Sequence, residues 1–581
     1  MIVRTKLIVP EQRSEMVLRQ HLTDRLAAGE KRPLILITGC AGAGKTALAV
    51  KWLSQKDRHP AWYTLDPRDN DPGLFLRHLL ISLLSISDPI DKAVGPLLQG
   101  HRSVADPDVA AAVLDAFSAE AGPVYLVFDN FHVLTCRPIL DFVAHLIQYA
   151  PKAFHLVIIS RSQPPFPLSR LRAGNRITEL HPEALKFSRD ETRFYLTRVA
   201  GLDLRPDQAD TIFEATEGWI SGLVLTRAAL HRKDPVSAIS NITPFVENAV
   251  VNEYFNEEVI DTLPPDLQDF LLTICILNRF NAALCREVTG RTGCRDVLTT
   301  LYRNHSFIIS LDAGGEWFRF HRLFARALRN HPHAISPQKA VLLHKKAALW
   351  NARHYLLDQA FDHALKAYDT EFLADLMEDH LMFYFLECDF EPVCRLLDAL
   401  PAQRIDTSLI LSVYRLLVLI STWDLIQAPG LFKALERRKT ELLDQCPDRK
   451  KEFALALWAL AGHAMAAAHD PALCRLDQLT RDIDHMPETY PLLTLFLSEL
   501  RLLIQLDRGD LSLSHAFIED QKELYQTLGI GFGYFTLLRA YAQIEIAMGN
   551  MTRATQRLGQ WFDQAAGTGI SAAPTRPIIF I

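Results

Sequence analysis

The chain has few of the features that accompany export, metal binding or nucleic-acid binding. Its nine cysteines are scattered, with no C-x-x-C pair and no cluster with histidine at zinc-ligand spacing. No export signal precedes Pro10, and the nearest approach to a membrane span, residues 453–469, is short, alanine-rich and contains two histidines. The formal net charge of −6 provides no general cationic surface for nucleic acid. We therefore expect a cytoplasmic protein with reduced thiols and no membrane segment.

One motif carries most of the chemical information. An apolar run over residues 34–38 leads into the pattern G-x-x-x-x-G-K-T and then into a helix-compatible stretch from Ala47. Such a loop points backbone N–H groups and the positive end of a helix at phosphate, while the lysine reaches the β- and γ-phosphates and the threonine hydroxyl ligates Mg²⁺. The alternative is a glycine-rich turn without a ligand. The predicted ATP/ADP and Mg²⁺ site comprises Gly39, Cys40, Ala41, Gly42, Ala43, Gly44, Lys45 and Thr46.

Two further apolar runs end in polar side chains. The run 124–128 ends in Asp129, which we expect to join Thr46 in holding Mg²⁺; the alternative is an aspartate that caps a helix. The run 156–159 ends in Ser160 and Arg161. Arg161 is a candidate sensor of the γ-phosphate, and a solvated arginine at the start of a loop is the alternative.

The pattern of the chain changes near residue 185. Before it, strand-like runs alternate with helical stretches, as in a parallel sheet covered by helices. After it, helices dominate, except for two strand-like pieces within 307–320 that predict the hairpin of a winged helix. Glycine-containing turns at 509–510 and 549–550, each followed by alanine, indicate stacked helix pairs. We predict an α/β P-loop NTPase domain (1–185), a helical subdomain (186–262), a winged helix (263–335) and a TPR-like α-solenoid (336–581).

In this order, the pieces resemble the signal-transduction ATPases with numerous domains, and among them the large LuxR-type regulators related to the maltose-regulon activator. Outside the phosphate loop, no single matching motif is specific, but their order and spacing are. The matching segments are Val17-Leu18-Arg19, Trp62-Tyr63-Thr64-Leu65-Asp66, Asp129-Asn130-Phe131-His132, Ser160-Arg161, Thr178-Glu179-Leu180 with Leu185-Lys186-Phe187, Thr216-Glu217-Gly218-Trp219, and Glu316 to Phe324.

The resemblance implies site residues that the phosphate-loop motif alone does not indicate. Arg19 becomes a candidate nucleotide contact, and His321 matches the winged-helix histidine that contacts phosphates in the resting state. A core or surface histidine is the alternative for His321. The family usually has a second acidic residue after the metal-binding aspartate, where this chain has Asn130. An amide can hold a water but cannot accept its proton, so we expect at most a slow regulatory ATPase.

The resemblance also implies how such a protein works. ADP holds a closed monomer, whereas an inducer on the repeat arm together with ATP releases a form that self-associates and controls transcription. The family's C-terminal helix-turn-helix domain has no counterpart here, because the final residues contain neither a recognition helix nor a basic cluster. We therefore expect no direct DNA binding by this chain. The alternative function is a nucleotide-binding interaction scaffold with little hydrolysis.

Overall fold

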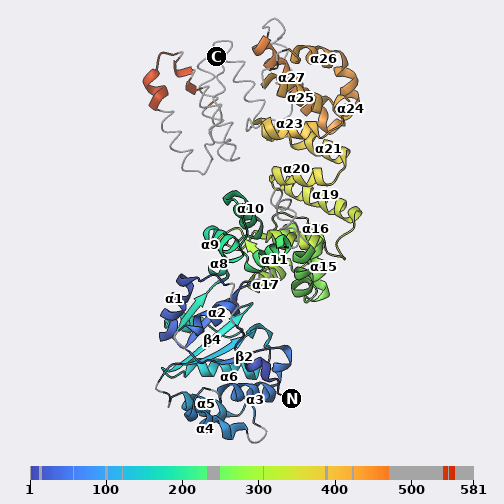
Figure 1. Ribbon diagram of the computed structural model, residues 1–581. Coiled ribbons are helices and arrows are strands. Elements are labelled where there is room, and N and C mark those ends of the chain that lie inside the picture. Colours follow the sequence, from blue (N-terminus) through green and yellow to red (C-terminus); the bar gives the residue numbers. More distant parts are fainter. Residues whose placement is uncertain are drawn as a thin grey trace. The chain divides into compact units, whose positions relative to one another are not determined.

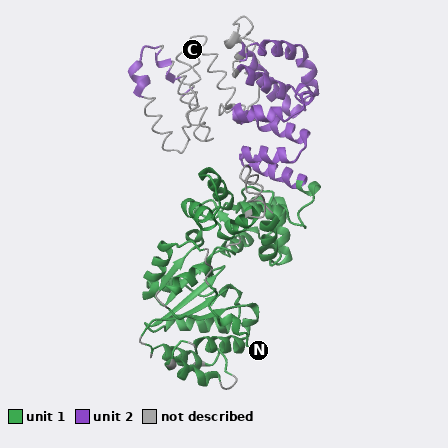
Figure 2. Ribbon diagram, in the orientation of Figure 1, with its two compact units in different colours: residues 1–340 green, residues 341–581 purple. Residues whose placement is uncertain are grey.

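The computed structural model divides the chain into two compact units, residues 1–340 and 341–581, which are described separately (Figure 2). Within the first unit, the described residues are 2–11, 16–55, 58–84, 86–98, 102–118, 120, 122–231, 249–304 and 307–340. Within the second unit, they are 341–386, 390–421, 424, 426–469, 518, 541–542, 544–546 and 548–556.

The first unit is built on a five-stranded parallel sheet with strand order β2-β3-β4-β1-β5 (Figure 1). Strands β1, β3 and β4 are buried along their whole length, which explains why they read as continuous apolar runs, and β2 and β5 are each buried at all but one residue. Thr38 pairs with Ser160, and Thr64 pairs with Asp129, so the carboxyl ends of neighbouring strands lie at one edge. The predicted α/β fold is confirmed. The strands are β1 (Leu34–Thr38), β2 (Ala61–Thr64), β3 (Val124–Asp129), β4 (Phe154–Ser160) and β5 (Ile177–Leu180).

Helices cover both faces of this sheet (Figure 1). Successive side chains of a strand point to opposite faces of the sheet, so the buried residues form two separate cores, one on each face. One core includes side chains of α1 and α2 and the other side chains of α3 to α6. The bounds are α1 (Gln20–Ala28), α2 (Lys45–Ser54), α3 (Pro72–Leu83), α4 (Asp88–Val94), α5 (Pro107–Ser118), α6 (Arg137–Gln148), α7 (Ser169–Ala173) and α8 (Pro182–Leu185).

Helices take over after residue 188, where Ser188 and Glu191 form the predicted capping box. Strands β6 (Ile308–Ser310) and β7 (Phe318–Phe320) form an antiparallel hairpin behind a group of helices, as a winged helix requires. The helices are α9 (Arg189–Phe194), α10 (Pro206–Thr216), α11 (Ile220–His231), α14 (Ala249–Phe255), α15 (Pro265–Ile274), α16 (Ala282–Thr289), α17 (Cys294–Arg303) and α18 (Arg322–Arg329).

The described part of the second unit is helical. Ala360 and Ala364 are buried on one face of α20, as predicted from their spacing. The turn at 509–510 lies outside the described residues, whereas the turn at 549–550 precedes a helical segment with Ala554 buried. The repeat period therefore stays a prediction. The helices are α19 (Pro337–Arg353), which begins in the first unit, α20 (Leu357–Lys366), α21 (Thr370–His380), α22 (Met382–Leu386), α23 (Phe390–Asp398), α24 (Ala402–Asp406), α25 (Leu409–Ser421), α26 (Ala428–Gln445) and α27 (Asp448–His469).

The described residues bear on two expectations from the sequence, which concern membrane-spanning helices and the state of the cysteines. None of the helices there combines the length and apolar character needed to cross a bilayer. The seven cysteines in that part of the chain, which exclude Cys388 and Cys474, are all free thiols.

Candidate nucleotide-binding site

The phosphate loop connects β1 to α2 at the carboxyl edge of the sheet. Gly42 and Gly44 have φ values of 68° and 78°, in the left-handed region that glycine adopts without steric cost. Helix α2 begins at Lys45, so its free N–H groups face the loop. The local sequence therefore folds into the geometry that binds phosphate at a helix N-terminus.

Lys45 has only neutral partners. Its Nζ donates to the carbonyl oxygens of Gly39 and Cys40 at 2.9 and 2.8 Å. Burial lowers the pKa of Lys45 from 10.5 to about 8, and Asp129 is too weak an influence to reverse that effect. Burial also raises the pKa of the Cys40 thiol to about 11, so this neighbour stays protonated at neutral pH. An anionic ligand in the loop would supply the negatively charged partner that Lys45 lacks.

Thr46 and Asp129 lie together, as predicted for a magnesium site. The Thr46 hydroxyl donates to the Asp129 carboxylate at 3.0 and 3.2 Å, and the backbone N–H of Asn130 donates to it at 2.9 Å. The carboxylate is buried, which raises its pKa. Oxygen donors in this arrangement suit Mg²⁺, and a divalent cation would offset the cost of burying the carboxylate. Among the described residues, no group of three or more metal-binding side chains forms a separate site.

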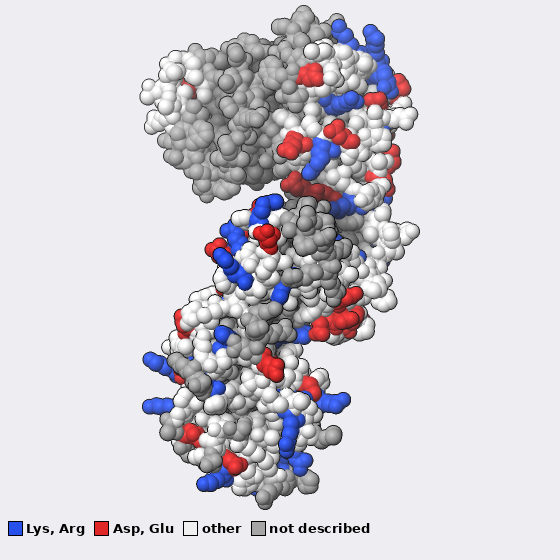
Figure 3. Space-filling model, viewed as in Figure 1, with Lys and Arg blue, Asp and Glu red and all other residues white. Residues whose placement is uncertain are grey.

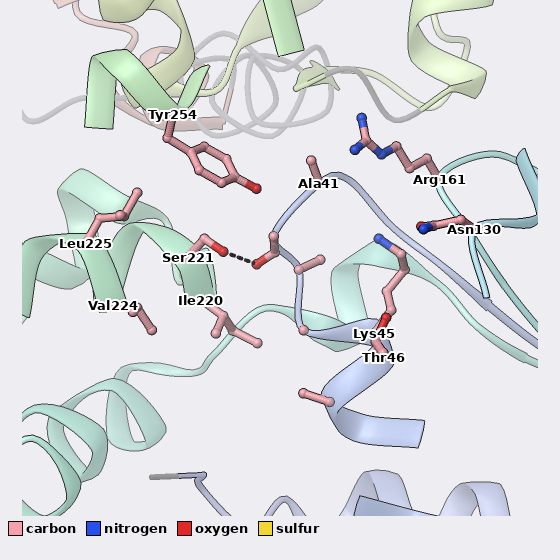
Figure 4. A pocket seen from close by; sticks show the side chains of 14 residues that line it. Ala41, Lys45, Thr46, Asn130, Arg161, Ile220, Ser221, Val224, Leu225 and Tyr254 are labelled. Atoms are coloured by element: carbon pink, nitrogen blue, oxygen red, sulfur yellow. Dashed lines mark hydrogen bonds between the residues drawn. The ribbon is translucent and has the colours of Figure 1, made fainter. Parts of the chain in front are cut away.

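A cavity of about 480 Å³ opens above the loop (Figure 4). Lys45, Asn130 and Arg161 lie on one side of it, and side chains of α11 and Tyr254 of α14 lie on the other. The cavity brings together most of the residues predicted from the sequence. Its lining consists of Ala41, Gly42, Ala43, Gly44, Lys45, Thr46, Ala47, Asn130, Arg161, Ile220, Ser221, Val224, Leu225 and Tyr254.

The helical wall of the cavity is what sequence reasoning missed. Trp219 donates its indole N–H to the carbonyl of Ala41 at 2.9 Å, and Ser221 donates both its backbone N–H and its hydroxyl to the carbonyl of Gly42, at 3.1 and 3.0 Å. We call Trp219 and Ser221 the loop latch. A β-carbon on Gly42 would lie 2.3 Å from the Ser221 hydroxyl oxygen, so the approach is as close as glycine permits. The sequence signal for this contact is the family resemblance of residues 216–219.

Two long hydrogen bonds, one from its backbone and one from its side chain, hold Arg161 near the cavity. Its N–H donates to Nδ1 of His132 at 3.4 Å, and its guanidinium reaches the carbonyl of Glu258 at the same distance. Burial, reinforced by the charge of Arg161, lowers the pKa of His132 to about 4. His132 therefore stays a neutral acceptor at physiological pH, which suits its bond to the Arg161 amide.

Arg19 lies elsewhere. Its guanidinium donates to the Glu191 carboxylate and to three backbone carbonyls at the end of α8 and in the turn that follows it, and it does not line the cavity. In this arrangement, Arg19 joins the start of α1 to that turn.

His321 does not line the cavity either. It is buried, and Nε2 lies 3.0 Å from the carbonyl oxygen of Thr216. Because a carbonyl only accepts, Nε2 carries the proton; Nδ1 has no partner among the described residues. Burial lowers the pKa of His321 to about 4, so the ring is neutral at pH 7. Its predicted phosphate contact stays a prediction.

Several known proteins are similar to this chain in sequence. Residues 256–340 match the family model of the MalT winged helix domain. The serine/threonine-protein kinase PknK of Mycobacterium tuberculosis (strain H37Rv) is 29% identical over 483 residues, which cover 82% of this chain and 43% of that protein. The HTH-type transcriptional regulator MalT of Vibrio parahaemolyticus is 30% identical over 388 residues, covering 65% of this chain and 42% of MalT. The chain thus spans less than half the length of these curated relatives.

One solved structure aligns along nearly the whole chain. It is a signal-transduction ATPase with numerous domains and a tetratricopeptide repeat sensor from Pyrococcus horikoshii, 16% identical, with a TM-score of 0.37, covering 97% of this chain and 79% of that one. The sequence relatives are more informative, because MalT proteins from several bacteria align with 65 to 70% of the chain. Together with the MalT-type winged helix that follows a P-loop fold, they show that the chain is MalT-like: a P-loop fold is followed by a winged helix domain of the MalT type.

Proposed function

We propose that the chain is a regulatory module in which ATP or ADP, bound with Mg²⁺ at the phosphate loop, determines how the helical parts of the first unit are held. The observation that carries this proposal is the loop latch, because the carbonyls of Ala41 and Gly42 bond to Trp219 and Ser221. A ligand that fills the loop bears directly on these bonds. The phosphate loop is therefore both the ligand site and a contact between subdomains.

The residues fit distinct roles in nucleotide binding. Lys45 contacts the phosphates, with the N–H groups of the loop and of the first turn of α2 around them. Thr46 and Asp129 hold Mg²⁺, which neutralises phosphate charge when bound. Arg161, at the cavity wall, is placed to respond to a third phosphate. This last role would distinguish ATP from ADP.

The finer regulatory scheme extends this proposal. An inducer binds the helical arm, residues 336–581, and ATP then promotes self-association that controls transcription, with residues 186–262 and 263–335 as moving subdomains. One relative is named a kinase and the others are named transcriptional regulators, yet each matches this chain over less than half of its own length. We infer that the shared part is the regulatory portion and that the output differs among relatives.

Asn130 favours a second candidate, a nucleotide-binding scaffold with little hydrolysis. It lines the cavity in a left-handed conformation with φ of 62°, which both asparagine and aspartate tolerate. Asn130→Asp therefore adds a possible base without changing the backbone. We expect slow phosphate release in the parent and an increase of roughly tenfold in the variant, which is less than the roughly 100-fold or more that a well-placed general base usually contributes. A fast parent with no gain in the variant would contradict this candidate.

The arginines of the winged helix bear on DNA binding. Arg319 bonds to Glu217, Arg322 to the carbonyl of Glu214 and Arg329 to the carbonyl of Cys275. On the face shown in Figure 3, basic side chains are interspersed with acidic ones. We therefore propose that this chain reads no DNA sequence. Selection from random duplex DNA should yield no consensus; a consensus lost in an Arg322→Glu, Arg326→Glu variant would contradict the proposal.

Calorimetry on the full chain tests the nucleotide site. ATP and ADP are titrated with Mg²⁺ and with EDTA, and light scattering is recorded for each complex. We expect binding of both nucleotides, tighter with Mg²⁺, and a larger particle with ATP than with ADP. Absence of binding would contradict the proposed site, whereas binding without any change in size would favour the scaffold.

A further inference from the structure

A charged pair links the winged helix to the connection between α10 and α11. Arg319 on β7 makes two parallel hydrogen bonds to the carboxylate of Glu217, at 2.8 and 3.0 Å. The backbone N–H of Arg322 donates to the same carboxylate at 3.2 Å. The Glu217 side chain is 13% exposed and that of Arg319 33%. Such a two-pronged geometry fixes orientation as well as distance.

The connection that Glu217 belongs to, residues 216–219, has little freedom. Glu217 and Gly218 have φ values of 50° and 71°, and a β-carbon on Gly218 would lie 2.2 Å from the carbonyl oxygen of Phe187. Phe187 donates its N–H to the carbonyl of Gly218 at 2.9 Å. His321 holds the carbonyl of Thr216 from the winged-helix side. We call residues 216–219 the connecting turn.

The connecting turn ends in the loop latch. Trp219 follows Gly218 directly, and its ring stacks on Phe255 with centroids 4.9 Å apart. Its N–H reaches Ala41, and Ser221 reaches Gly42. Only three residues therefore separate Glu217, whose carboxylate bonds to Arg319, from Ser221, which bonds to the phosphate loop. A shift of Glu217 would move both members of the latch, because no flexible segment lies between them.

We infer that Arg319 and Glu217 form a positioning pair for the phosphate loop. They hold the connecting turn so that Trp219 and Ser221 fix the carbonyls of Ala41 and Gly42, although neither residue of the pair lines the cavity. The inference deepens the proposed nucleotide function and rests on it. Breaking the pair frees the latch, and the loop then releases nucleotide faster.

Two variants break the pair and a third restores it. Glu217→Gln keeps the size of the side chain but removes its charge, Arg319→Glu places two carboxylates together, and the combination Glu217→Arg with Arg319→Glu re-forms an ion pair in reverse. The control is Arg137→Gln, which breaks an exposed i,i+4 pair with Asp141 on α6. Thermal unfolding of each full chain establishes that the variants fold.

Hydrogen exchange of the Ser221 amide is the direct measurement, because this N–H donates to Gly42. In nucleotide-free chains, we expect about fivefold faster exchange there in both single variants, recovery in the reversed pair and no change in Arg137→Gln. Release of a fluorescent ADP analogue should accelerate by a similar factor. Ser221 lies close to the connecting turn, but nucleotide release reports on the phosphate loop, where Ala41 is 178 positions from Trp219. A packing defect confined to the turn would therefore raise exchange at Ser221 without accelerating nucleotide release.

Several outcomes overturn the inference. Unchanged exchange at Ser221 in folded Glu217→Gln and Arg319→Glu chains would do so, as would an equal increase in Arg137→Gln. Failure of the reversed pair to restore protection would also count against it. If Arg319→Glu does not fold, Glu217→Gln decides alone. If the parent binds no nucleotide, the proposed function fails, while hydrogen exchange still decides whether the pair positions the loop.

Discussion

Two lysines, one in each unit, have opposite surroundings. Lys45 in the first unit bonds only to neutral carbonyls, and burial lowers its pKa to about 8. Lys450 in the second unit lies 2.9 Å from Glu378 and 2.8 Å from Asp379. Burial lowers the pKa of Lys450 too, but the two carboxylates outweigh it and the net shift is upward.

The difference separates a binding site from a structural contact. Lys450 joins α27 to α21 and completes a network in which Glu378 also accepts from Ser408 at 2.8 Å. Its charge is compensated inside the protein. Lys45 has no acidic hydrogen-bond partner and lies beside an open cavity, where an anionic ligand would compensate its charge. A buried cation with neutral partners therefore indicates a candidate binding site, whereas one paired with carboxylates indicates a structural contact.

The largest expected effect concerns the paired lysine. Lys450→Met leaves the buried Glu378 carboxylate without its main cation, which should reduce the stability of the second unit by about 3 kcal/mol. Hydrogen exchange of buried α25 amides in the full chain measures this. The control Lys451→Met removes an exposed pair with Asp448 and should cost below about 0.5 kcal/mol. Equal losses in the two variants would contradict the assignment, and nucleotide affinity should not change in either.

Removing the other lysine should have the complementary result. Lys45→Ala deletes the cation that faces the phosphates and should lower ATP affinity by about 100-fold, with little loss of stability, because Lys45 hydrogen-bonds to backbone carbonyls and not to a carboxylate. Calorimetry measures the affinity. Lys51→Ala, on the same helix, serves as the control and should bind as the parent does. A Lys45→Ala chain that retains its affinity would remove the contrast between the two lysines.

The lowered pKa of Lys45 predicts how the affinity for ATP depends on pH. Below pH 8 the ammonium is charged in the free chain and binding needs no proton; above pH 8 the free chain has lost that proton and binding must take it up again. Affinity for ATP should therefore fall as pH rises above 8, by up to about tenfold per unit. Lys45→Arg, which stays charged, should remove this fall. A parent profile that is flat between pH 8 and 9.5 would show that Lys45 is not the titrating contact.

His321 lies between the two lysines in how fully its polar atoms are paired. One ring nitrogen is hydrogen-bonded, and the other has no partner among the described residues. His321→Ala removes the bond to Thr216 that holds the connecting turn, so the closed arrangement should lose stability relative to the assembled one. We expect a shift of about fivefold in favour of ATP-bound assembly, seen by light scattering with each nucleotide. His321→Gln, which keeps a side-chain N–H donor, should shift less. Identical particle sizes and nucleotide preferences in all three chains would leave His321 as a core histidine.

What the sequence predicts well is local. The strands β1, β3 and β4 each follow from an apolar run of adjacent residues. The phosphate loop, residues 39–46, likewise follows from glycines and a lysine that are close together in the sequence. The bond between Trp219 and Ala41 spans 178 residues, and the contacts of Arg19 span 165 to 172. No periodicity encodes such contacts. Lys450 itself lies in the charged segment Asp448 to Glu452, which reads as a solvated surface; only the packing of α27 against α21 reveals its partners.

The long span of the loop latch has a consequence during protein synthesis. The phosphate loop leaves the ribosome early, and the tryptophan that bonds to it follows 178 residues later, roughly 10 to 35 s at about 5–20 residues per second. His321 emerges 105 residues after Thr216, a further delay of roughly 5 to 20 s at the same rate. A growing chain therefore displays a complete phosphate loop before the helices that restrain it exist. Cellular nucleotide can reach that loop first, so the bonds of the loop latch can form around a ligand already in place.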